Sequence, residues 1–119
     1  MSKFLERPPI LLRAEGAAAA ALAIVLYREI GTSWWLFAIL ALAPDLGALG
    51  YLISVRVGTA TYNAVHTTVL PLALAAVGVL SDRETAIAVS LIWLTHIAVD
   101  RAVGYGLKLP TGFKDTHLG

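Results

Sequence analysis

The sequence has no cysteine and few charged residues. The absence of cysteine excludes a disulfide framework, cysteine-ligated zinc and iron–sulfur clusters. Charged residues make up only 14% of the chain, whereas soluble domains contain about 25%. No basic run is present and the net charge is only +1, so we expect no nucleic-acid partner.

Apolar residues are abundant instead. They make up 58% of the 119 residues, and a soluble fold of this size would leave a large part of that excess facing water. The composition therefore predicts an all-α integral membrane protein, with a single domain over residues 1–119.

Four stretches are long and apolar enough to cross a bilayer core, which takes about 20 residues. They cover about residues 10–30, 33–55, 58–80 and 84–107, and a polar tail follows over residues 108–119. We expect the four spans to pack as a four-helix bundle.

Basic residues are distributed unevenly between the two ends of these spans. Toward one side lie Lys3, Arg7, Arg13, Arg56, Arg101, Lys108 and Lys114, whereas Arg28 and Arg83 lie toward the other. Because the excess of lysine and arginine stays on the cytoplasmic side, we expect a multi-pass protein of the bacterial inner membrane with both termini in the cytoplasm.

Ionisable side chains occur inside the expected spans, where each costs about 2.5–3.5 kcal/mol at the helix centre. At a rise of about 1.5 Å per residue, four of them lie at depths that agree within about two helical turns. These residues are Asp45, His66, His96 and Asp100. We therefore expect them to converge on one cavity in the cytoplasmic half, close to helix distortions at Pro44 and Pro71.

Two imidazoles and two carboxylates at one depth suit a divalent transition metal. Zinc, manganese and iron accept such donors, whereas calcium prefers more oxygen ligands. Further polar residues that could join the layer are Glu15, Tyr62, Asn63, Tyr105, Asp115 and His117.

The same residues have other interpretations. The histidines could join helices through hydrogen bonds of about 0.6 kcal/mol, and Asp45 and Asp100 could pair with Arg13 or Arg101. Two histidines could also hold a haem, although carboxylates suit a hard ion better. Acid and histidine chains form proton relays, so an ion or proton carrier and a purely structural membrane subunit are alternatives to an enzyme.

Short motifs resemble two families. Ala43-Pro44-Asp45, His66-Thr67-Thr68 and His96 with Asp100 resemble the motifs of membrane-bound metal-dependent hydrolases related to the YdjM proteins. Residues 12–16, 43–45, 62–66 and 104–119 resemble the small bacterial membrane proteins of domain-of-unknown-function family 4260. The second resemblance covers most of the chain and implies no function.

The first resemblance implies hydrolysis of a membrane-associated substrate, a lipid phosphoester or related ester. Asp45, His66, His96 and Asp100 would hold the metal, which would activate water and polarise the scissile oxygen. Arg101 or Lys108 would then stabilise developing negative charge. Membrane lipid is the expected partner, and the chain could form a homo-oligomer.

Overall fold

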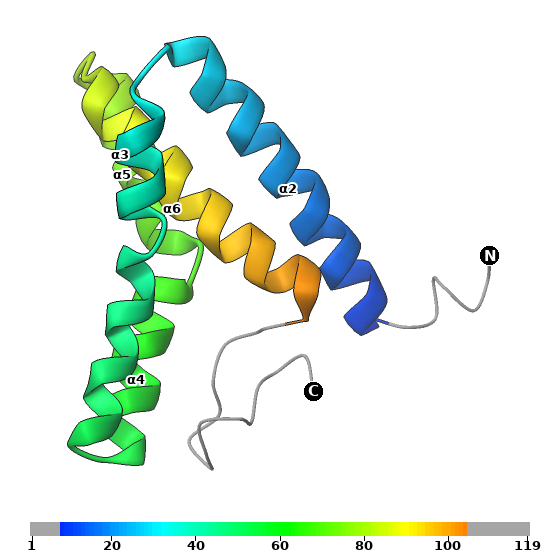
Figure 1. The fold of residues 1–119 in the computed structure, drawn as a ribbon, viewed down its shortest axis with the longest axis vertical. Coiled ribbons are helices and arrows are strands. Elements are labelled where there is room, and N and C mark those ends of the chain that lie inside the picture. Colours follow the sequence, from blue (N-terminus) through cyan, green and yellow to red (C-terminus); the bar gives the residue numbers. More distant parts are fainter. Residues whose placement is uncertain (1–7, 105–119) are drawn as a thin grey trace.

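The computed structural model describes residues 8–104, and all regular structure in that range is helical (Figure 1). The elements are α2 (Pro8–Ile30), α3 (Trp34–Leu40), η1 (Ala43–Leu52), α4 (Val55–His66), α5 (Val69–Leu80) and α6 (Glu84–Val103). The predicted all-α bundle is confirmed.

These elements make up four candidate membrane spans. Their bounds are Ile10–Ile30, Trp34–Leu52, Val55–Leu80 and Glu84–Val103. The shortest span has 19 residues, close to the length of about 20 that a bilayer core requires. Large apolar side chains such as Leu52 and Leu80 are exposed on the outer faces, as expected where lipid takes the place of water. The protein is therefore a multi-pass membrane protein.

The second and third spans are interrupted in their middle. Helix α3 ends at Leu40, and η1, a 3-10 helix, begins at Ala43 with Pro44 in its first turn. Helix α4 ends at His66, and α5 begins with Pro71 in its first turn. A proline nitrogen has no hydrogen to donate, and the first turn needs no such donor. Each proline therefore starts a new segment instead of bending a continuous helix.

Helix α2 lies antiparallel to α6 (Figure 1). A Cβ atom added at Gly16 would lie 2.7 Å from the Ala98 carbonyl oxygen, so the absence of a side chain permits this close approach. Nearby, Arg13 Nε donates to the Ala102 carbonyl at 3.0 Å. The start of α2 and the end of α6 therefore lie at the same end of the bundle, which we call the terminal end.

Segment η1 pairs with α4. A Cβ atom added at Gly47 would lie 2.6 Å from Val65 Cγ2, and Thr61 Oγ1 donates to the Gly47 carbonyl at 2.5 Å. The Tyr51 hydroxyl also lies 3.2 Å from Thr59 Oγ1. These contacts hold the segment that follows Pro44 against the helix that ends in His66.

The remaining core lies between α2, α3 and α6. Tyr27 is fully buried with Ala88 and Ile92, and its hydroxyl donates to the Ser33 carbonyl at 2.5 Å. This bond fixes the turn between α2 and α3. At the other end, α6 stops at Val103 because Gly104 is left-handed, with φ 99°; the sequence had placed this boundary near residue 107.

Candidate metal centre

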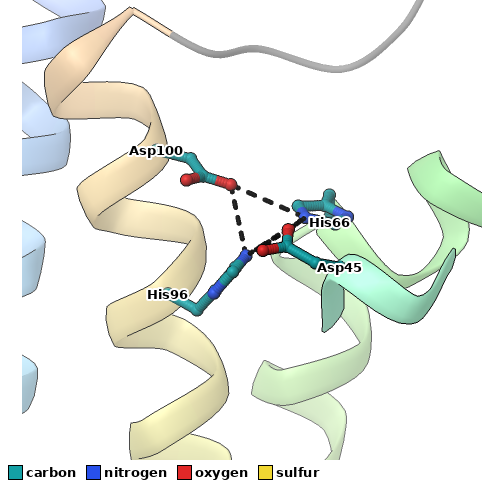
Figure 2. Close-up of side chains that lie close together, drawn as sticks. All are labelled: Asp45, His66, His96 and Asp100. Atoms are coloured by element: carbon teal, nitrogen blue, oxygen red, sulfur yellow. Dashed lines mark hydrogen bonds and ion pairs between the residues drawn. The ribbon is translucent and has the colours of Figure 1, made fainter. Parts of the chain in front are cut away.

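Four ionisable side chains from three elements converge at the two interruptions (Figure 2). Asp45 comes from η1, His66 is the last residue of α4, and His96 and Asp100 lie on α6. The two α6 residues are four positions apart and therefore share one helix face. One ligand atom from each of the four lies within 4.8 Å of the others. We call this group the Asp–His cluster.

The distances in the Asp–His cluster match those around a small metal ion. His96 Nε2 lies 3.1 Å from Asp45 Oδ1 and 3.3 Å from Asp100 Oδ2. His66 Nε2 lies 3.3 Å and 3.5 Å from the same two oxygens, and the two Nε2 atoms are 3.2 Å apart. Neighbouring ligand atoms bonded to one ion at about 2.0–2.2 Å are about 3.0–3.6 Å apart, and the oxygens of Asp45 and Asp100 lie within 4.8 Å of each other.

Backbone carbonyls determine which ring nitrogen of each histidine carries its hydrogen. His66 Nδ1 lies 2.8 Å from the Tyr62 carbonyl oxygen, and His96 Nδ1 contacts the Ala41 carbonyl oxygen. A carbonyl oxygen only accepts, so Nδ1 must be the donor in both rings. In the neutral imidazole, Nε2 then presents a lone pair, as in metal-binding histidines. With both rings neutral, the Asp–His cluster therefore has two bare nitrogens facing each other and two carboxylates.

The Asp–His cluster is closed on one side and open on the other. The side chains of His66 and His96 are 4% and 9% exposed, and that of Asp100 is 22% exposed. Asp45 is 59% exposed. The open side is therefore the one formed by η1.

Neighbouring side chains hold His66 in place. The Tyr62 ring stacks on the His66 imidazole with centroids 3.7 Å apart. The interruption after α4 leaves carbonyls without helical partners, and two α6 side chains donate to them: Trp93 Nε1 to Val65 at 2.6 Å and Arg101 Nη2 to His66 at 3.1 Å. These bonds satisfy groups that would be costly to leave unpaired in a bilayer.

Two cavities lie near the Asp–His cluster. An apolar cavity of about 190 Å³ lies against Pro44, Val65 and Trp93. A second cavity of about 310 Å³ has mostly apolar walls but is also lined by Glu15, Thr68 and Arg101; we call it the polar cavity after these three side chains. Pro44 and Val65 precede Asp45 and His66 in the sequence, and Arg101 follows Asp100, so each cavity adjoins segments that carry the Asp–His cluster.

The other residues expected in the polar layer fall in different places. Glu15 is exposed and borders the polar cavity, whereas Tyr62 is buried against His66. The Asn63 carbonyl accepts from the Thr67 amide at 2.9 Å, ending α4. Outside the described residues lie Tyr105, Lys108, Asp115 and His117.

Sequence reasoning missed the role of Trp93 and of the two carbonyls that orient the histidines. Trp93 is three residues before His96 and therefore lies on the same helix face. This spacing is the one sequence signal that could have indicated its role. The carbonyls of Ala41 and Tyr62 carry no residue-specific signal, because every residue has one.

Comparison with known proteins gives one match. No curated protein and no solved structure matches the chain. The family of the domain of unknown function DUF4260 matches residues 9–119. Because the match takes in nearly the whole sequence, including all four residues of the Asp–His cluster, the chain belongs to the DUF4260 family.

Proposed function

We propose that this protein is a metal-dependent hydrolase that cleaves an ester or phosphoester bond in a membrane lipid. The observation that supports it best is the arrangement of two bare Nε2 atoms and two carboxylates around one point. With neutral rings and ionised carboxylates, these four groups all present lone pairs and repel one another. A divalent cation would bind all four and balance the two negative charges.

Protons fit this arrangement less well than a metal ion. If both imidazoles were protonated, two positively charged N–H groups would face each other across the 3.2 Å between the Nε2 atoms, and like charges at this distance disfavour one another. A single proton shared between the two Nε2 atoms would satisfy both nitrogens but would leave two carboxylates with one positive charge between them. A metal ion accepts all four ligands at once.

The donor set favours an ion that accepts more than four ligands. Zinc with four protein ligands is closed to substrate, as in structural sites. Manganese and iron accept further ligands and leave positions for water and substrate. The exposed side of Asp45 is where such positions would be reached. The proposed cofactor is therefore manganese or iron in preference to zinc.

The reaction transfers the acyl or phosphoryl group of the lipid to water. A bound ion supplies an activated water and polarises the scissile oxygen. The water oxygen bonds to the carbonyl carbon or phosphorus while the bond to the alcohol breaks, and the departing oxygen takes up the proton that the water loses. Arg101, which borders the polar cavity, would stabilise the negative charge that develops. Lys108 in the same role stays a prediction.

One observation favours a second candidate, an ion carrier. The spans that bear Asp45 and His66 are both interrupted next to these residues, and transporters bind ions where spanning helices are broken. A carrier would bind the ion reversibly and move it without cleaving lipid.

Metal analysis followed by a lipid-cleavage assay tests the proposal. We expect detergent-purified protein to hold one equivalent of manganese or iron and to cleave phospholipid in vesicles only with the metal. Asp45→Asn should abolish cleavage. Asp82→Asn is the matched control, because Asp82 lies in the loop before α6 with φ 58°, which asparagine tolerates. Folded protein that binds none of zinc, manganese and iron would overturn the proposal, and transport of the ion without cleavage would establish the carrier.

A further inference from the structure

The walls of the apolar cavity beside the Asp–His cluster are almost entirely apolar. Its walls are Leu40, Ala43 and Pro44 at the α3–η1 junction, Val65 on α4, and Val89, Ile92 and Trp93 on α6. Trp93 has the only polar side-chain atom among them, and its indole N–H already donates to the Val65 carbonyl. A water molecule needs two to four polar partners, so these walls disfavour water.

The volume is large enough for a hydrocarbon segment. An apolar cavity of about 150 Å³ stays dry and takes up benzene, and this one measures about 190 Å³. It opens between elements of two interrupted spans, where the α3–η1 junction cannot pack as a regular helix against α6. The cavity is thus a product of the same interruption that positions Asp45.

The walls of the cavity continue directly into the Asp–His cluster. Pro44 precedes Asp45 and Val65 precedes His66. On α6, Val89, Trp93, His96 and Asp100 recur at three- and four-residue intervals and so lie on one face. A chain lying in the cavity would therefore point its end at the Asp–His cluster.

Depth along α6 orders the two cavities and the Asp–His cluster. At about 1.5 Å per residue, Arg101 lies about 3 Å from the terminal end of α6 at Val103, His96 about 10 Å and Val89 about 21 Å. The midplane of a bilayer core lies about 15 Å from its surface. Along α6, the order from the terminal end is therefore Arg101 at the polar cavity, then His96 in the Asp–His cluster, and then Val89 at the apolar cavity.

A bilayer lipid has the same order. Its polar head lies at the surface, its ester linkages lie below the head, and its chains reach the midplane. We propose that the apolar cavity binds the hydrocarbon chain of the lipid substrate, drawn from the leaflet at the terminal end of the bundle, so that the scissile linkage meets the Asp–His cluster. The substrate assignment rests on the proposed hydrolase function, whereas binding of a chain in the cavity can be tested without any turnover.

Fluorescence of Trp93 reports directly on the occupant. In a Trp34→Phe, Trp35→Phe background, Trp93 is the sole tryptophan. The probe is a single-chain phosphocholine with bromine at the end of its chain, titrated into protein held in a fixed amount of alkyl-maltoside detergent. Bromine quenches tryptophan on contact. We expect quenching that saturates, because one chain fills one site.

Two variants that fill the cavity should weaken this quenching at least tenfold. They are Val89→Phe on α6 and Ala43→Leu on η1, so the test survives if one of them fails to fold. Val79→Phe is the matched control, because Val79 is exposed on the outer face of α5. It should leave the saturable quenching unchanged.

Three outcomes would overturn the assignment. The first is quenching that rises linearly without saturation, and the second is quenching that both filled variants retain. The third is a change of oligomeric state in the filled variants, which would mean that a second copy of the chain occupies the cavity. The titration is run with and without metal and involves no cleavage. Saturable quenching in a protein that never cleaves lipid would therefore refute the proposed function and leave the chain site standing.

Discussion

The Nε2 atoms of His66 and His96 lie 3.2 Å apart, while the Nδ1 atom of each ring donates to a backbone carbonyl. Two histidines that only joined helices would place a hydrogen between their nitrogens. In neutral rings the carbonyls of Tyr62 and Ala41 take the available hydrogens, so both lone pairs point inward. The proposed ligand role requires this arrangement, which makes both histidines testable.

Loss of either histidine should weaken metal binding. We expect His96→Gln and His66→Gln each to lower the affinity for manganese or iron by more than tenfold, since changes even in groups that orient the ligands cost about 10–100-fold. Competition with a fluorescent chelator measures the affinity. Asp82→Asn, remote from the Asp–His cluster, should leave the metal affinity unchanged. An unaltered affinity in both histidine variants would mean that His66 and His96 are not ligands.

A double-mutant cycle separates ligation by Asp100 from a simple ion pair with Arg101. A ligand should couple to His96, so Asp100→Asn with His96→Gln should show a coupling of about 0.5–3 kcal/mol only when metal is present. An ion pair should couple to Arg101, and Asp100→Asn with Arg101→Gln would then restore stability. Thermal unfolding in detergent reports both. Rescue by the arginine change without any metal dependence would defeat the ligand assignment.

Trp93→Phe should destabilise the protein because it removes a hydrogen bond. The change keeps an aromatic ring but removes the donor to the Val65 carbonyl, and a buried group left unsatisfied costs about 1–3 kcal/mol. The same change at Trp35, which is 81% exposed, should cost less than about 0.5 kcal/mol. Chemical denaturation in mixed micelles gives both values, and equal losses would contradict the role of the indole donor.

The contact of α2 with α6 at Gly16 should not tolerate a side chain. An added Cβ atom would lie 2.7 Å from both the Ala98 carbonyl oxygen and Arg101 Cβ, so Gly16→Val must push the helices apart and should cost at least about 1–3 kcal/mol. Ala17 is exposed, and Ala17→Val serves as the control. Thermal unfolding compares the two; similar midpoints would mean that the helices are not held this closely.

Accessibility to a membrane-impermeant thiol reagent tests the orientation. The natural chain has no cysteine, so Ser2→Cys, Ser81→Cys and Gly119→Cys each introduce a single reactive thiol. The asymmetry of basic residues predicts labelling of the first and third only from the cytoplasmic side and of Ser81→Cys only from the other. Labelling of Ser81→Cys from the cytoplasm alone would invert the topology.

Hydropathy sufficed to predict the all-α membrane fold, because a spanning helix must be apolar over about 20 residues. Counting residues from the span ends also sufficed to group Asp45, His66, His96 and Asp100, since a helix rises by a constant amount per residue. Neither method could locate the ends of α3 and α4 or the 3-10 form of η1. Both features depend on which backbone carbonyls accept hydrogen bonds from α6 side chains, and the sequence does not show these bonds because they form only when the helices pack.

The surroundings of the Asp–His cluster were less predictable than its members. Acids and histidines are conspicuous in an apolar span because they are costly there. Trp93 is not conspicuous in the same way, since tryptophan is common near membrane surfaces. Its hydrogen bond and the apolar cavity beside it arise from the interruptions at Pro44 and Pro71, whose positions the sequence shows but whose geometry it does not.

The hydrogen bonds from Trp93 and Arg101 to the end of α4 join three of the four residues of the Asp–His cluster through one helix, α6. His66 is tied to the helix that bears His96 and Asp100. Asp45 belongs to a different segment and is the most exposed of the four. If the proposed ion binds, it would reach the four ligands and leave them on the side of Asp45, because the other three side chains are at most 22% exposed.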